Sequence, residues 1–346
     1  MTDYRGRLFK EDKAIALPFK FMDSSEKPRH LKIAAVVHIY YEDLSYEILS
    51  YMHNLPVGSD LFITTDNPRK LDVIKSVFSA YKLGKVQYAI VVNRGRDVAA
   101  KLVGMKHVYQ EYDFVLNLHS KRSLHSSDIV AWRTYLYETL CGSREIVHDA
   151  LTIFSIFPNI GLIFPQHFEL IRQWVSWTGN FDMAASLAAK MGGILNPDQA
   201  IDFPSGSMFW IRTAAIKPLL ELDLTVEDFE EERGQADNTL AHVIERLMAI
   251  VCEIAGFDWV KIGRREFFNH DELVLEIADL AGLKEFVSTQ TIQLTGEKII
   301  NCMYDCNSKI YPPPSALKAS VSRNEKMMAY GKEFTSWTKI GDIAIP

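Results

Sequence analysis

Long apolar runs are missing from this chain of 346 residues. A membrane-spanning helix needs roughly 18 to 20 consecutive apolar residues, and no stretch approaches that length. Residues 1–21 carry charges throughout and have no long apolar core, which does not fit a secretory signal. We therefore expect a cytoplasmic protein that at most touches the inner face of the plasma membrane.

Cysteine is scarce, and a net positive charge is absent. The four cysteines are too few for a disulfide framework, so we expect reduced thiols. Cys302 and Cys306 form a single C-x-x-x-C without a second pair, which disfavours a zinc site. The net charge of −6 provides no global basic field, so we expect no nucleic-acid partner. Any phosphate site must be a local cluster of basic residues.

Two common nucleotide-binding patterns are also absent. Neither G-x-G-x-x-G nor G-x-x-x-x-G-K-[ST] occurs, so a dinucleotide-binding or P-loop interpretation loses its main support. The composition, 48% hydrophobic and 24% charged, is that of an ordinary globular enzyme.

The first half of the chain alternates between short apolar runs and helical patterns. This order predicts the α/β class, with a mostly parallel sheet and helices on both faces. The expected strands are 31–40, 60–65, 86–92 and 112–118, and the expected helices are 42–55, 68–81 and 98–111.

The second half is less regular. We expect residues 1–30 to form an N-terminal arm, 31–262 the main domain and 263–346 a C-terminal extension. Further helices are expected at 127–140, 143–157, 181–191, 236–255 and 271–283, and further strands at 160–165, 203–212 and 257–262.

Polar residues follow each of the first four strands. His38 and Tyr40 follow the first strand and Asp66 the second, while Asn93–Asp97 follows the third and His119–Ser123 the fourth. Ligands of open α/β sheets bind beyond the carboxyl ends of the strands. We expect these four loops to converge there.

Several of these residues suit a phosphate. Arg94 and Arg96 offer planar guanidinium groups to phosphate oxygens, and Gly95 lets a ligand approach the backbone. Lys121 and Arg122 add two cations. A solvated turn and a basic surface loop remain the alternative interpretations.

Two later segments suit a sugar and a proton transfer. Ser205, Ser207 and Trp210 fit the wall of a sugar site, although a core position is favoured for the tryptophan alone. Asp237 precedes a helix that carries His242, and a carboxylate there can serve as a general base. A helix cap is the alternative for Asp237.

Taken together, several ordered segments resemble the rhamnan synthesis F family over about residues 30 to 262. The segments are His38–Tyr41, Asp60–Thr65, Asn93–Asp97, Leu118–Ser123, Pro204–Trp210 and Gly234–His242. The resemblance implies a GT-A-like glycosyltransferase with a Rossmann-like sheet. It implies a rhamnosyltransferase that uses dTDP-L-rhamnose, inverts the anomeric centre and extends a lipid-linked surface polysaccharide such as an O-antigen. Its partners would be the nucleotide-sugar donor, the lipid-linked acceptor and other glycosyltransferases of the pathway.

A looser resemblance to inverting GT-A enzymes assigns roles to single residues. Many of those enzymes hold a metal with a D-x-D pair, where this chain has Asn117-Leu118-His119. Asparagine is a poor Mg²⁺ anchor, so we expect no metal requirement, with Mg²⁺ or Mn²⁺ as the disfavoured alternative. Asp237 is the expected catalytic base, and the residues expected to bind the diphosphate are Arg94, Arg96, Lys121, Arg122 and His119. The residues expected to bind the nucleoside are His38, Tyr40, Asp66 and Asp97. The residues expected to contact the sugar or the acceptor are Ser205, Gly206, Ser207, Trp210 and His242.

The absent D-x-D pair supports a different class of function. A non-catalytic, glycan-binding or scaffold subunit of a polysaccharide synthase would also lack it. A phosphatase or sulfotransferase is disfavoured because no nucleophile motif is present.

Overall fold

The computed structural model describes residues 2–3, 12–22, 31–121, 127–172, 174–197, 201–235, 237–268 and 273–290. The chain divides into two units, 1–291 and 292–346, and the fold below is that of the first. Arg122, Cys302 and Cys306 lie outside the described residues.

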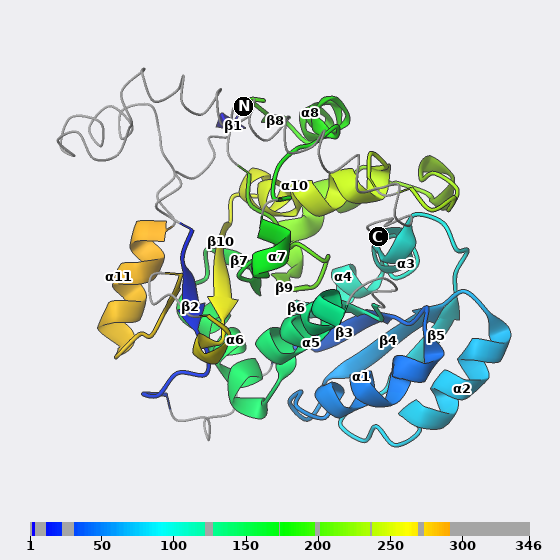
Figure 1. Ribbon diagram of the computed structural model, residues 1–346, viewed down its shortest axis with the longest axis horizontal. Helices are drawn as coiled ribbons and strands as arrows, with labels where there is room; N and C mark the ends of the chain where they lie inside the picture. Colours follow the sequence, from blue (N-terminus) through cyan, green and yellow to red (C-terminus); the bar gives the residue numbers. More distant parts are fainter. Residues whose placement is uncertain are drawn as a thin grey trace. The chain divides into compact units, whose positions relative to one another are not determined.

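A nine-stranded sheet forms the centre of the unit, in the order β11-β2-β10-β7-β9-β6-β3-β4-β5 (Figure 1). Every pairing in it is parallel except those of β9, which runs antiparallel to β6 and β7. The predicted α/β class is therefore confirmed. The strands are β2 (Ala14–Ala16), β3 (Ile33–His38), β4 (Asp60–Thr65), β5 (Val86–Ile90), β6 (Phe114–His119), β7 (Ile160–Pro165), β9 (Phe209–Arg212), β10 (Asp258–Gly263) and β11 (Val274–Leu275), and β1 (Thr2–Asp3) pairs separately with β8 (Gly193–Ile194).

Strand β3 shows why the sheet needs helices on both faces. All of its residues are buried. Ile33, Ala35 and Val37 belong to one hydrophobic core, whereas Ala34 and Val36 belong to the other. A central parallel strand that is apolar on both sides must be covered on both sides.

The helices divide between these two cores (Figure 1). One face carries α1 (Ser45–Met52), α2 (Pro68–Phe78), α5 (Ser127–Cys141), α6 (Arg144–Ile156) and α11 (Leu280–Gln290). The other carries α3 (Arg96–Leu102), α4 (Val108–Glu111), α8 (Phe181–Lys190), α9 (Lys217–Leu220) and α10 (Leu240–Ile254). The remaining helical segments are α7 (Glu169–Arg172), η2 (Glu42–Leu44), η3 (Thr213–Ile216), η4 (Val226–Asp228) and η5 (Arg265–Phe267).

Two predicted helices differ from the structure in ways that shape the site. The helix expected at 98–111 is split into α3 and α4 by turns around Gly104. The helix expected from residue 236 begins at Leu240, because Asn238 has a φ of 63°, which a right-handed helix does not accommodate.

The sheet extends beyond the predicted domain limits at both ends. Strand β2 comes from the expected arm, and β11 comes from the expected extension. The prediction of a helix over 271–283 is wrong, because Val274 and Leu275 pair with β2. Helix α11 begins only at Leu280, after Asp279 accepts a hydrogen bond from the amide of Gly282. No helix within the described ranges is long and apolar enough to cross a membrane.

Candidate functional site

The ends of β3, β4 and β6 meet at one edge of the sheet. In the parallel register His38 lies beside Thr64 on one side and His119 on the other. The loops that follow these strands therefore leave from the same edge, as the sequence predicts.

His38 is buried at this edge. Its Nδ1 lies 3.0 Å from the hydroxyl of Thr64. Burial lowers the pKa of His38 to about 4, and the positive charge of Lys101 acts in the same direction against that of Asp97. His38 is therefore a neutral imidazole at pH 7.

The backbone after β3 is held by Ser120, a residue that the sequence analysis does not single out. Its hydroxyl oxygen accepts hydrogen bonds from the amides of Tyr40 and Tyr41, at 2.8 and 2.9 Å. The ammonium of Lys70 lies 3.9 Å from the centroid of the Tyr40 ring and 2.8 Å from Asp66. Tyr40 and Asp66 thus meet through Lys70, and no sequence motif marks that lysine.

A buried ion pair lies next to His119. Lys101 Nζ is 2.6 Å from Asp97 Oδ2, and His119 Nδ1 is 3.3 Å from the same oxygen. Burial raises the pKa of Asp97, but its neighbours, with Lys101 as the cation among them, lower it by more, so the carboxylate stays ionised. Burial also lowers the pKa of His119, which makes that ring neutral. Lys101 is the cation of the pair, and the sequence analysis does not single it out.

Arg94 and Arg96 bind the chain's own loop over residues 227–235. Arg94 donates to the carbonyl oxygens of Glu227 and Phe229. Arg96 donates from its guanidinium to the carbonyl of Gln235 and from its amide to the carboxylate of Glu232. Both guanidinium groups are therefore partly occupied by backbone oxygens rather than open to a ligand. They connect the start of α3 to the loop before α10.

Lys121, another of the expected phosphate residues, places its ammonium on the ring of Trp132. Its Nζ lies 3.6 Å from the centroid of the Trp132 ring, a cation–π contact. Burial lowers the pKa of Lys121 to about 8, with the charges of Glu245 and Asp97 opposing that shift. The side chain is still mostly protonated at pH 7. Arg122 follows directly but lies outside the described residues.

The turn over Ser205–Ser207 is closely packed against α5 and bonded to Lys101. Gly206 has a φ of 90°, and a Cβ there would lie 2.8 Å from Leu136 Cδ1 and 3.0 Å from Trp132 Cζ2. The carbonyl of Ser207 accepts a hydrogen bond from Lys101 at 2.6 Å. Only glycine therefore suits the centre of this turn.

A chain of buried polar groups holds the first residue of that turn. The hydroxyl of Ser205 lies 3.0 Å from His167 Nδ1, and His167 Nε2 lies 2.7 Å from Asp202 Oδ1. Lys261 donates to the other oxygen of Asp202 at 2.6 Å. Ser205 and His167 are both almost completely buried, so this chain positions the turn.

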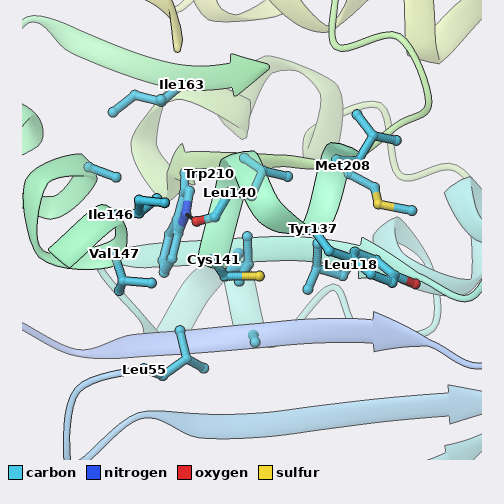
Figure 2. Close-up of a cluster of buried hydrophobic side chains, with 14 of the residues drawn as sticks. Leu55, Leu118, Tyr137, Leu140, Cys141, Ile146, Val147, Ile163, Met208 and Trp210 are labelled. Atoms are coloured by element: carbon cyan, nitrogen blue, oxygen red, sulfur yellow. Dashed lines mark hydrogen bonds between the residues drawn. The ribbon is translucent and has the colours of Figure 1, made fainter. Parts of the chain in front are cut away.

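Trp210 lies in the hydrophobic core. Its side chain is completely buried, and its indole N–H donates to the carbonyl of Leu140 at 3.0 Å (Figure 2). Met208 and Ile163 belong to the same cluster (Figure 2). The core position favoured for this tryptophan is confirmed, and its ring is not available to stack on a sugar.

Asp237 lies in a dense hydrogen-bond network. One oxygen accepts from Thr178 at 2.6 Å and from Arg246 at 3.1 Å. The other accepts from Asn180 at 2.8 Å and from the amide of Asn238 at 2.9 Å. Burial raises the pKa of Asp237, and these donors lower it by more, so the net shift is downward.

Asp237 is not the cap of α10. Thr239 occupies the N-cap position, and the carboxylate of Glu230 accepts from the first helical amide, that of Leu240, at 3.0 Å. The ring of His242 follows in the first turn, with Nδ1 2.7 Å from the hydroxyl of Thr239. Burial lowers the pKa of His242 to about 4, and the positive charge of Arg96 adds to this shift.

The residues in the D-x-D position, Asn117 and His119, are an amide and an imidazole. The side-chain oxygen of Asn117 accepts a hydrogen bond from the hydroxyl of Tyr109. The carboxylate next to His119, that of Asp97, is paired with Lys101. Among the described residues no group of three or more His, Cys, Asp or Glu side chains could hold a metal ion.

Comparison with known proteins shows the family to which the chain belongs. Residues 7–256 match the family model described as rhamnan synthesis protein F. Two strains of Xanthomonas campestris pv. campestris, B100 and ATCC 33913, each have a protein described as uncharacterized protein WxcX that is 34% identical over 224 residues. That alignment covers 64% of this chain and 31% of each relative, so the chain spans about a third of their length.

Two solved structures were also found. A mannosyltransferase from Pyrobaculum calidifontis, in complex with GDP-Man and Mn²⁺, is 10% identical with a TM-score of 0.39, over 93% of this chain and 86% of its own. A 4-diphosphocytidyl-2C-methyl-D-erythritol synthase from Anaerococcus prevotii is 12% identical with a TM-score of 0.35, over 75% of this chain and 96% of its own.

Proposed function

Because the chain belongs to the rhamnan synthesis protein F family, we propose that it is a glycosyltransferase of polysaccharide synthesis. The donor is a nucleotide-diphosphate sugar, with dTDP-L-rhamnose favoured. The acceptor is a growing lipid-linked polysaccharide at the cytoplasmic face of the membrane, and the transfer inverts the anomeric centre.

The observation that carries this proposal is the position of Lys121. Its ammonium is held against Trp132 just past the carboxyl end of β6. A leaving diphosphate develops negative charge, and a preorganised cation in a partly buried site stabilises that charge strongly. Lys121 therefore takes the diphosphate, together with Arg122, and His119 borders the same place.

The nucleoside binds at a different part of the same edge of the sheet, after β3 and β4. Tyr40 and Asp66, which meet through Lys70, offer a ring face and a carboxylate to the base and ribose. His38, a buried neutral imidazole, and the carboxylate of Asp97 are assigned to the same nucleoside part. The Ser205–Ser207 turn and His242 line the sugar and acceptor side.

We propose that fixed cations replace a metal in this reaction. The side chains at 117 and 119 are an amide and an imidazole, and neither supplies the carboxylate oxygens that Mg²⁺ prefers. Turnover should therefore persist in EDTA. Loss of turnover in EDTA with recovery on adding Mg²⁺ or Mn²⁺ would contradict this.

Calorimetric titration with dTDP, UDP and GDP, each with and without Mg²⁺, tests the proposed function. We expect binding that selects one base and does not depend on Mg²⁺. Lys121→Ala should weaken it at least tenfold, because a charge-assisted contact to phosphate contributes about 1.5–3 kcal/mol. Lys217→Ala on the exposed surface of α9 is the matched control. Absence of binding to all three nucleotides would favour the non-catalytic, glycan-binding alternative.

A further inference from the structure

Glu245 is a second carboxylate in the site, on α10 behind the Ser205–Ser207 turn. Its Oε1 accepts a hydrogen bond from the amide of Gly206 at 2.7 Å. Among the described residues its other oxygen has no hydrogen-bond partner. Glu245 therefore has one oxygen that orients it and one that none of the described residues occupies, which leaves it able to accept a proton.

Contacts connect Glu245 to the proposed diphosphate cation. Gly206 donates its amide to Glu245 and lies next to Trp132. The ring of Trp132 makes the cation–π contact with the ammonium of Lys121. The adjacent Ser207 is held by Lys101. The carboxylate of Glu245 and the ammonium of Lys121 thus both lie close to the Trp132 ring, one through Gly206 and the other directly.

The same face of α10 carries an unsatisfied polar group. His242, three residues before Glu245, is 6% exposed. Its Nε2 is buried and has no hydrogen-bond partner among the described residues. Residues three apart on a helix are neighbours on its surface, so this nitrogen and Glu245 face the same region. A buried polar atom without a partner is costly, and a ligand hydroxyl would satisfy it.

Asp237 is poorly suited to accept the proton. Both of its oxygens already receive hydrogen bonds, two each. These donors stabilise the carboxylate, which makes it a weaker base. In contrast, burial raises the pKa of Glu245, although the charges of Arg246 and Lys121 lower it in part and that of Asp97 raises it. A base whose pKa lies nearer the working pH transfers protons more effectively.

We propose that Glu245 is the general base of the transfer and that Asp237 is a positioning residue that holds Arg246 and the 178–180 loop. The acceptor hydroxyl oxygen attacks the anomeric carbon of the donor, and the bond from that carbon to the diphosphate oxygen breaks. The diphosphate leaves with the bonding electron pair, and the hydroxyl proton moves to Glu245. This inference rests on the proposed glycosyltransferase function.

Glu245→Gln and Asp237→Asn, compared in one assay, test the assignment. The readouts are calorimetric binding of dTDP, UDP and GDP and steady-state hydrolysis of dTDP-L-rhamnose, UDP-glucose and GDP-mannose, in which water replaces the acceptor. We expect Glu245→Gln to lower kcat at least about 100-fold with nucleotide affinity retained, as for loss of a general base. Glu245→Asp should recover part of kcat. Glu253→Gln, at the far end of α10, is the matched control and should keep wild-type kcat.

The pH dependence separates the two carboxylates. In Asp237→Asn the acidic limb of the kcat profile should remain, with the main loss in KM. In Glu245→Gln that limb should disappear. Wild-type kcat in Glu245→Gln overturns the assignment, and so does loss of the acidic limb in Asp237→Asn alone. If the wild-type protein still binds nucleotide in either case, the proposed function stands. Absence of both nucleotide binding and donor hydrolysis in the wild type overturns the proposed function as well.

Discussion

The ammonium of Lys101 connects Asp97 with Ser207. It donates a hydrogen bond to the carbonyl oxygen of Ser207 at 2.6 Å, and it lies 2.6 Å from Asp97 Oδ2. The lysine is 2% exposed. One buried cation therefore ties α3 to the turn that lines the proposed sugar site. Stability and site geometry are coupled through this residue.

Replacing Lys101 by methionine should cost about 3–5 kcal/mol of the free energy of unfolding, because Asp97 would remain buried without its cation. Urea unfolding measures this loss. The double variant Lys101→Met/Asp97→Asn should recover part of it, since the buried charge is then removed as well. Lys106→Met, in a pair with the exposed Asp223, is the matched control and should cost less than about 1 kcal/mol. A loss of similar size in Lys106→Met would contradict the argument.

Nucleotide affinity should fall as the pH rises from 7 to 9. Lys121 binds a diphosphate only when protonated, and its pKa is lowered to about 8, so the cation is lost over this range. Titration with the preferred nucleoside diphosphate at several pH values measures the effect. Lys121→Arg should remove the decline, because a guanidinium stays protonated. An unchanged decline in the arginine variant would assign it to another group.

Stability should fall as the pH drops from 7 towards 4. The pKa of His38 is lowered from 6.5 to about 4 in the folded protein, so the unfolded chain binds more protons between these values. This histidine alone contributes up to about 3 kcal/mol, present above pH 6.5 and lost as the pH falls. His38→Gln should show a shallower decline in urea unfolding at pH 7 and pH 5. Parallel declines in the two proteins would remove His38 as the cause.

Gly206→Ala should impair the site more than the same change at Gly192. Both glycines have a positive φ, 90° and 85°, so both substitutions cost about 1–2 kcal/mol of backbone strain. Only at Gly206 would the new Cβ meet Leu136 and Trp132, whereas nothing lies within 4 Å at Gly192. Displacing Trp132 also moves the partner of Lys121. We expect weaker nucleotide binding in Gly206→Ala alone, measured by calorimetry, and equal binding in both variants would contradict this.

The sequence by itself determined the class of the fold and the edge of the sheet at which the loops after β3, β4 and β6 meet. Runs such as Ile33–His38 are buried on both faces. When such runs alternate with helical patterns, they predict a parallel sheet that is covered by helices on both faces. It also singled out Lys121 and the Ser205–Ser207 turn as candidate site residues, because the lysine follows a strand end and the turn combines small residues. Boundaries were predicted less well where tertiary pairing decides, as at Val274 and Leu275, which form an edge strand only because β2 is beside them.

Only the tertiary structure decided the partner of each polar side chain. The sequence predicts that Arg94 and Arg96 bind phosphate. In the structure their guanidinium groups donate to carbonyl oxygens of the loop before α10. Asp237 and Glu245 are both carboxylates near the start of one helix, and no local pattern predicts how many hydrogen bonds the described residues give to each. The difference arises from Thr178, Asn180 and Gly206, which are distant in sequence and come into contact only when the sheet and α10 have packed.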